Sequence, residues 1–216
     1  VMDNNLWEGP VGDKVREYFA APVLGLTWDE PLLNLEHMPP SVFRGTTRHR
    51  RAVLFVGRDS VGGAQIQDDL YAAPQKVAVI KGASDSILIS SIEPSADQII
   101  SAIKKMELKE SQKRFLRSLS KETVLGEKFG ISLRLPSVYE VGKEEDNFVW
   151  IDREIQKGSM NIIVYEMPAN SFESDSTFVQ DIVQMRDSIG QKYIPGPDVP
   201  GKITYMGTEK AFAPYV

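Results

Sequence analysis

The chain contains no cysteine and only two histidines, His37 and His49, among its 216 residues. Cysteine and histidine supply most of the nucleophiles, neutral-pH bases and soft-metal ligands that proteins use. Their shortage excludes disulfides and argues against thiol enzymes, serine triads and zinc sites. We therefore predict no catalytic residue, no bound metal and no cofactor, and the balance favours binding over catalysis.

Long apolar runs and an excess of basic residues are also missing. No stretch approaches the roughly 20 apolar residues that a membrane-spanning helix needs, and no signal peptide is visible at the start. The net charge of −5 argues against a nucleic-acid partner, which usually selects a basic surface. The 42% of hydrophobic residues is typical of a globular protein with a real core.

Apolar spacing predicts the elements of the first half. Val11, Val15 and Phe19 recur on one helical face that begins at Pro10 and ends before Pro22. Further along we predict strands over 32–36, 51–57, 76–81 and 87–92, a short helix over 64–71, and a helix that begins at Ser95 and breaks near 118–120.

The second half restarts with a helix over 121–129, for which Gly130 is the C-terminal cap. A polar turn over 143–147 between two apolar runs indicates a hairpin. The predicted strands are 131–135, 138–141, 148–151, 160–167 and 203–206, and the last helix covers 178–189.

This order predicts an α+β fold with mixed or antiparallel sheets and long helices. We expect two ferredoxin-like halves of the βαββαβ type, an N-terminal α+β half over 1–118 and a C-terminal α+β half over 119–216. Val1 and Met2 look like the tail of a strand, so we also expect the native chain to continue beyond both ends.

A basic cluster and the tryptophans are the candidate binding groups. Guanidinium groups suit phosphate or carboxylate, and indole rings suit the apolar faces of sugars. The alternatives are a solvated loop for the arginines and ordinary packing for the tryptophans. The candidate binding residues are Arg44, Arg48, Arg50, Arg51, Trp7 and Trp28.

Three other patterns favour structural interpretations. The glycine-rich stretch 57–63 lacks the Lys and Ser/Thr that a phosphate-binding loop requires, so it predicts a turn. The acids at 144–146 lack calcium-loop spacing and predict a polar hairpin tip. No Gly-x-Ser-x-Gly elbow is present, and His37 is expected to be a structural histidine.

Four strings carry a family resemblance that spans the whole chain. They are Val-Met-Asp-Asn-Asn-Leu-Trp-Glu-Gly-Pro-Val-Gly-Asp (1–13), Met-Pro-Pro-Ser-Val-Phe (38–43), Lys-Glu-Glu-Asp-Asn-Phe-Val-Trp-Ile (143–151) and Met-Arg-Asp-Ser-Ile-Gly-Gln-Lys-Tyr-Ile-Pro-Gly (185–196). In this order they resemble a family of Bacteroidota envelope lipoproteins known only as a domain of unknown function. The resemblance implies a cell-envelope location and a lipid-bearing cysteine upstream of Val1, which would be the membrane contact. It supplies no catalytic residues.

Three functions follow from these observations. The leading hypothesis is an envelope-anchored, non-catalytic interaction or scaffold module whose partners are envelope proteins or glycans. The alternative is a binding module for an anionic glycan or lipid that uses the arginines and exposed tryptophans. The second alternative is a carboxylate-based hydrolase of envelope polymers, which needs two acids in a cleft and a raised pKa for at least one of them.

Overall fold

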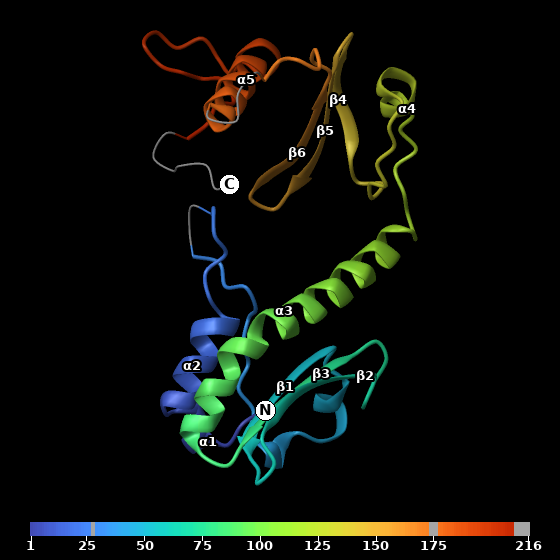
Figure 1. The fold of residues 1–216 in the computed structure, drawn as a ribbon. Coiled ribbons are helices and arrows are strands. Elements are labelled where there is room, and N and C mark those ends of the chain that lie inside the picture. Colours follow the sequence, from blue (N-terminus) through green and yellow to red (C-terminus); the bar gives the residue numbers. More distant parts are fainter. Residues whose placement is uncertain (27–28, 173–176, 210–216) are drawn as a thin grey trace. The chain divides into compact units, whose positions relative to one another are not determined.

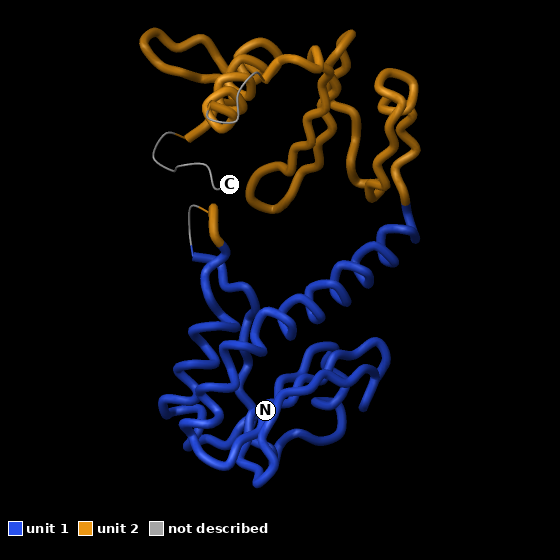
Figure 2. Tube along the Cα trace, in the orientation of Figure 1, with its two compact units in different colours: residues 1–23, 28–118 blue, residues 24–27, 119–216 orange. Residues whose placement is uncertain are grey.

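The computed structural model describes residues 1–26, 29–172 and 177–209. The chain divides into two compact units, residues 1–23 with 28–118 and residues 24–27 with 119–216 (Figure 2). Each unit combines helices with a three-stranded sheet (Figure 1). The predicted α+β class is therefore confirmed.

Unit 1 has a mixed sheet in the order β1-β3-β2. Strand β3 pairs with β1 in parallel and with β2 in antiparallel orientation. The predicted strands at 51–57 and 76–81 are present as β1 and β3. The elements of this unit are α1 (Asn4–Trp7), α2 (Pro10–Phe19), two 3-10 turns (Pro40–Val42 and Gly45–His49), β1 (Ala52–Arg58), β2 (Gly63–Asp68), β3 (Lys76–Gly82) and α3 (Asp85–Phe115).

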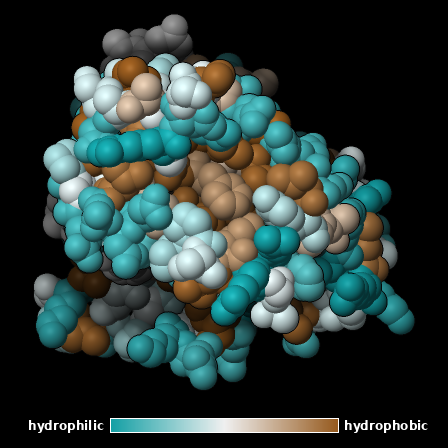
Figure 3. All heavy atoms as spheres, turned by 90° about the horizontal axis from the view of Figure 1, so that it is seen from below, coloured by the Kyte–Doolittle hydropathy of each residue, from teal (hydrophilic) through white to brown (hydrophobic). Residues whose placement is uncertain are grey.

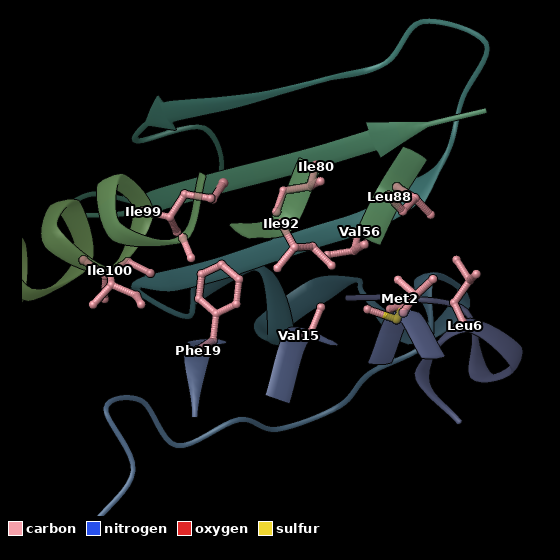
Figure 4. Packing of buried hydrophobic residues seen from close by; sticks show 14 residues of the cluster. Met2, Leu6, Val15, Phe19, Val56, Ile80, Leu88, Ile92, Ile99 and Ile100 are labelled. Carbon is pink, nitrogen blue, oxygen red and sulfur yellow. The ribbon is translucent and has the colours of Figure 1, made fainter. Parts of the chain in front are cut away.

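The core of unit 1 lies between the sheet and helices α2 and α3. Val15 and Phe19 of α2 face Ile92 and Ile99 of α3, and Ile80 of β3 belongs to the same buried cluster (Figure 4). Each of these five side chains is at most 5% exposed. Because full burial of one such side chain contributes about 1.5–3 kcal/mol, this cluster is the main source of the unit's stability.

Helix α3 corrects two predictions. The run 87–92 is helical because Ser84 caps the helix, its hydroxyl accepting from the Ile87 N–H, and because Leu88 and Ile92 share one buried face. The helix also continues through Pro94. The Ser95 hydroxyl donates to the Ser91 carbonyl 2.7 Å away, instead of starting a new helix.

Two further predictions in unit 1 are wrong. Residues 64–68 form β2 instead of a helix, because they pair with β3 in a ladder that runs from Gly63 opposite Lys81 to Asp68 opposite Lys76. Residues 32–36 belong to no strand, although they run beside α2 and the N-terminus. The alternating apolar residues at 32–36 therefore belong to an extended segment that does not pair with a strand of the sheet.

Unit 2 has an antiparallel sheet in the order β4-β5-β6. Its elements are α4 (Val124–Phe129), β4 (Glu140–Glu145), β5 (Phe148–Ile155), β6 (Gly158–Tyr165) and α5 (Phe178–Tyr193). Gly130 caps α4 with a φ of +65°, as its position predicts. The pairing of β4 with β5 shifts by one residue between Val141 and Lys143, which indicates a bulge at Gly142.

A separate core holds unit 2 together. Leu125 of α4 packs with Val149 and Ile151 of β5, and all three are fully buried. The predicted strands at 131–135 and 203–206 are not strands, and neither run has a partner ladder among the described residues. A ferredoxin-like unit has four strands, so that finer assignment stays a prediction. Within the described part of the chain, no helix is long and apolar enough to cross a bilayer.

Candidate binding groove

A groove of about 630 Å³ runs through unit 1 beside the outer edge of β1. Its opposite wall is the extended segment 31–38, and α1, α2 and α3 contribute further lining. The floor is mainly apolar, with Phe19, Leu54 and Ile103 among its side chains. Three of the six predicted binding residues also line it, namely Trp7, Arg50 and Arg51.

The extended wall is fixed by backbone hydrogen bonds to the N-terminal helices. The N–H groups of Leu32 and Leu33 donate to the carbonyls of Ala21 and Phe19, at 2.7 and 3.1 Å. At the other end the Met2 N–H donates to the Met38 carbonyl at 3.1 Å. The groove is therefore a built feature of the fold, with both of its long sides held by main-chain contacts.

Trp7 and His37 both line the groove and form a stacked pair. Their ring centroids lie 4.8 Å apart with an interplanar angle of 7°, and His37 Nε2 lies 2.9 Å from the Met2 carbonyl oxygen. The Arg16 guanidinium lies over the same indole, 4.4 Å from the ring centroid. His37 is thus a structural histidine, and the indole of Trp7 is already engaged by side chains of its own unit.

The two arginines of the groove are paired with acids from distant parts of the sequence. Arg50 Nη2 lies 3.0 Å from a Glu36 oxygen. Arg51 makes two bonds of 2.7 Å to the two carboxylate oxygens of Glu107 on α3. These bonds lower the pKa of Glu107 and raise the pKa of Arg51. The groove is therefore bordered by charged side chains that neutralise each other within unit 1.

We expect Glu107→Gln to lower the free energy of unfolding at pH 7 by at most about 1 kcal/mol, because both side chains of this pair are partly exposed. The folded pKa of Glu107 is depressed, so its contribution is present above the unfolded pKa and is lost as pH falls through the folded pKa. Urea unfolding at pH 7 and pH 3 checks this. The difference between the variant and the parent chain should be smaller at pH 3 than at pH 7, and a constant difference would contradict the assignment.

The remaining predicted binding residues lie elsewhere or outside the described residues. Arg48 donates from Nε to the Phe43 carbonyl at 3.3 Å, and its guanidinium lies 5.3 Å from the centroid of the Tyr71 ring. Arg44 is exposed at the start of the 3-10 turn 45–49 and does not line the groove. Trp28 lies outside the described residues. The cluster that is continuous in sequence is thus divided in space.

Sequence reasoning missed the acids that complete the groove. Glu36 and Glu107 are 14 and 56 positions away from their arginine partners. Nothing in the local pattern around either acid marks such a pairing, since Glu36 follows Leu35 and Glu107 lies between Met106 and Leu108. The one sequence feature that pointed to an ion pair at the groove was a charged residue directly before a buried strand, namely Arg51 before β1.

The other acidic and glycine-rich patterns lie in ordinary structural settings. Glu144 and Glu145 pair with Lys128 and Lys143, at 3.1 and 2.9 Å. The glycine-rich stretch 57–63 joins β1 to β2, and Asp59 near its centre pairs with Lys81 at 2.6 Å. Among the described residues there is no group of three or more His, Cys, Asp or Glu side chains placed to hold a metal ion.

Val1 lines the groove, and its amine donates to the Leu54 carbonyl. Burial lowers the pKa of this amine from 8.0 to about 6. The unfolded chain then binds more protons between pH 6 and 8, so stability rises across this range and is constant above it. We expect a rise of about 2 kcal/mol in the free energy of unfolding of the 216-residue chain.

Chemical denaturation from pH 5.5 to 8.5 measures this rise. The matched control carries an N-terminal acetyl group, which removes the titrating amine and leaves every side chain in place. The difference between the two proteins should follow a single titration near pH 6 to 8. Identical pH profiles for the free and acetylated chains would show that the amine does not titrate as a buried group.

Two family models divide the chain between them. Residues 118–216 match Domain of unknown function (DUF4837), and residues 1–116 match Domain of unknown function (DUF8532). No curated protein and no solved structure matches the chain. The expected membership of a domain of unknown function is confirmed, and the lipoprotein and Bacteroidota parts of the resemblance stay predictions. Because the match over residues 1–116 covers more than half of the chain, the chain belongs to the family described as Domain of unknown function (DUF8532).

Proposed function

We propose that this chain is an envelope-anchored, non-catalytic interaction or scaffold module, held at the membrane by a lipid upstream of Val1. The observation that carries the proposal is the internal neutralisation of the groove. Both of its carboxylates, Glu36 and Glu107, are bonded to arginines of the same unit. The acids and arginines that line the groove are thus engaged with each other, which leaves them poorly placed for acid–base catalysis or for binding a charged ligand and favours a non-catalytic role.

The same pairing argues against the hydrolase alternative. A general acid that works near neutral pH needs a raised pKa, which burial in an apolar pocket provides. The pKa of Glu107 is instead lowered by its bidentate contact with Arg51. A glycosidase-type mechanism would require this carboxylate to leave its partner before it took up a proton.

The anionic-ligand alternative meets a related obstacle. A phosphate or carboxylate ligand would have to displace Glu36 from Arg50 or Glu107 from Arg51, at the cost of the existing ion pairs. Apolar groups also reach the surface of the molecule, between hydrophilic residues, on the side seen in Figure 3. Exposed apolar groups within a polar surround favour protein partners over polyanions.

Three assays separate the candidate functions. For location, cells that produce the full-length protein are fractionated beside a variant in which the expected lipid-bearing cysteine is serine, and we expect only the former in the envelope fraction. For ligands, dextran sulfate and anionic phosphatidylglycerol vesicles are titrated into the 216-residue chain, with no saturable binding expected. For catalysis, purified envelope glycan is incubated with the chain and released products are measured, with none expected.

Each assay has an outcome that would overturn the proposal. Recovery of the full-length protein in the soluble fraction would contradict the proposed lipid anchor. Saturable binding of dextran sulfate that disappears in Arg50→Gln and Arg51→Gln would favour the anionic-ligand alternative. Product release that is lost in Glu107→Gln would establish the hydrolase.

We also propose that the two units are related to ferredoxin-like halves. In unit 1 both long helices pack on one face of the sheet, as that architecture requires. Among the described residues each sheet has one strand fewer than a unit of this type, and its three strands follow one another in the chain with no helix between them. An experimental structure of a longer form of the chain tests the idea, and three-stranded sheets in that structure would contradict it.

A further inference from the structure

The outer edge of β1 has backbone groups that point away from the sheet. The Lys76 N–H donates to the Arg51 carbonyl and the Asp59 N–H donates to the Gly82 carbonyl, so the odd-numbered residues of this strand face β3. Main-chain groups alternate in direction along a strand. The carbonyl of Ala52 and the N–H of Leu54 therefore face the groove.

Val1 already pairs with this edge in strand fashion. Its nitrogen donates to the Leu54 carbonyl, and its carbonyl accepts from the Val56 N–H at 3.0 Å. Bonds from one residue to positions j−1 and j+1 of its neighbour are the pattern of a parallel ladder, which places Val1 opposite Phe55. Helices α1 and α2 then connect Val1 to β1, as a helical crossover connects parallel strands in a β-α-β unit.

From this geometry we infer that the groove is a strand-docking site, and that its occupant is the segment of the same protein joined to the Val1 nitrogen in a longer form of the chain. Three residues of that segment lie opposite Leu54, Val53 and Ala52, parallel to β1. The second residue before Val1 donates its N–H to the Ala52 carbonyl and accepts from the Leu54 N–H. The segment thereby adds a fourth strand to the sheet of unit 1.

The lining of the groove specifies the character of the occupant. The residue next to Val1 lies opposite Leu54, on the side of the sheet that packs against α2 and α3. The second residue lies opposite Val53, on the side of Phe43 and Val77. Both faces are apolar, so both positions favour β-branched apolar residues.

Continuity of the chain favours this occupant over a second molecule. The first bonds of the ladder are already made by Val1, and the next residue is covalently placed to continue them. Burial also lowers the pKa of the Val1 amine to about 6, which shows that this position disfavours a charged group. An amide nitrogen at the same place carries no charge and donates the same bond to Leu54.

Amide hydrogen exchange of Leu54 tests the inference directly. The 216-residue chain is compared with the same chain extended before Val1 by Thr-Val-Val, and with one extended by Thr-Pro-Val. The Thr-Val-Val extension should slow exchange at Leu54 about tenfold, as expected for one added hydrogen bond. Proline in the second position keeps the carbonyl that accepts from Leu54 but has no N–H for the Ala52 carbonyl, so the Thr-Pro-Val chain should protect Leu54 clearly less than the Thr-Val-Val chain. The Ile151 amide of β5, which lies in unit 2, serves as the unchanged reference.

A disulfide test does not depend on exchange rates. The chain has no cysteine, so a cysteine at the second position before Val1 and Val53→Cys form the sole possible pair. Directly opposite residues on neighbouring strands are about 4.8 Å apart, which is within the Cα–Cα range of disulfides. We expect this pair to oxidise fully in air, whereas a cysteine at the third position, on the other face, should leave Val53→Cys reduced.

Three outcomes would overturn the inference. Unchanged Leu54 exchange on extension by Thr-Val-Val would show that the segment does not dock. Equal protection by Thr-Pro-Val would show that the ladder is not responsible. Leu54 protection in the 216-residue chain that grows with protein concentration would identify a second copy as the occupant.

Discussion

Gly12→Ala should lower the free energy of unfolding of unit 1 by about 3 kcal/mol or more, the upper range for overpacked sites. A Cβ atom at Gly12 would lie 1.9 Å from the Trp7 carbonyl oxygen and 2.5 Å from its carbon. Both are backbone atoms, which cannot rotate aside as a flexible side chain does. The close approach of α2 to the end of α1 therefore requires glycine at this position.

Gly57→Ala is the matched control, because it adds the same methyl group to the same unit. No heavy atom lies within 4 Å of the Cβ that it would introduce. We expect it to change stability by less than about 1 kcal/mol, since only the backbone preference of the strand changes. Thermal unfolding followed by circular dichroism compares the two variants, and equal losses would show that close approach is not the cause.

Phe148→Ala should destabilise unit 2 by about 3–5 kcal/mol, as measured for buried aromatic truncations. The Phe148 side chain is fully buried at the start of β5 and stacks on Tyr193 of α5, with 4.1 Å between ring centroids. The substitution removes this contact and leaves a cavity between the sheet and the helix. Amide exchange along β5 should accelerate with the loss of global stability.

Phe178→Ala controls for the loss of an aromatic ring from the same unit. The Phe178 side chain is 43% exposed, so its removal opens no closed cavity. We expect a loss below about 1 kcal/mol for such a partly exposed site. If Phe178→Ala proves as costly as Phe148→Ala, the stability of unit 2 does not depend on its buried core.

The elements that the sequence predicts correctly are those whose local pattern and burial agree. Val11, Val15 and Phe19 repeat at helical spacing and are all buried in α2. The apolar run of β1 lies between charged residues and pairs along its full length with β3. In these segments the local sequence pattern is enough to predict the element, without information about the rest of the chain.

The failures occur where a partner decides the structure. The run 64–68 has little apolar content, and it forms β2 because β3 offers it a ladder. The run 131–135 alternates well, but it pairs with no strand in the described part of the chain, and an unpaired strand is not stable. At 87–92 a serine cap and burial against the sheet outweigh the β-branched composition.

The candidate site was predicted in part for the same reason. Trp7, Arg50 and Arg51 stand out by residue type, and the structure places all three around one groove. Their partners His37, Glu36 and Glu107 come from the extended wall and from α3. Such pairings depend on the fold, and no single local pattern records them.

The bulge in β4 has a consequence for behaviour at high protein concentration. β4 is a border strand of its sheet, and it carries Lys143, Glu144 and Glu145 next to the register shift at Gly142. Charged side chains and a local kink make a strand a poor template for pairing between molecules. Unit 2 is thereby protected along this border against aggregation into intermolecular β-structure.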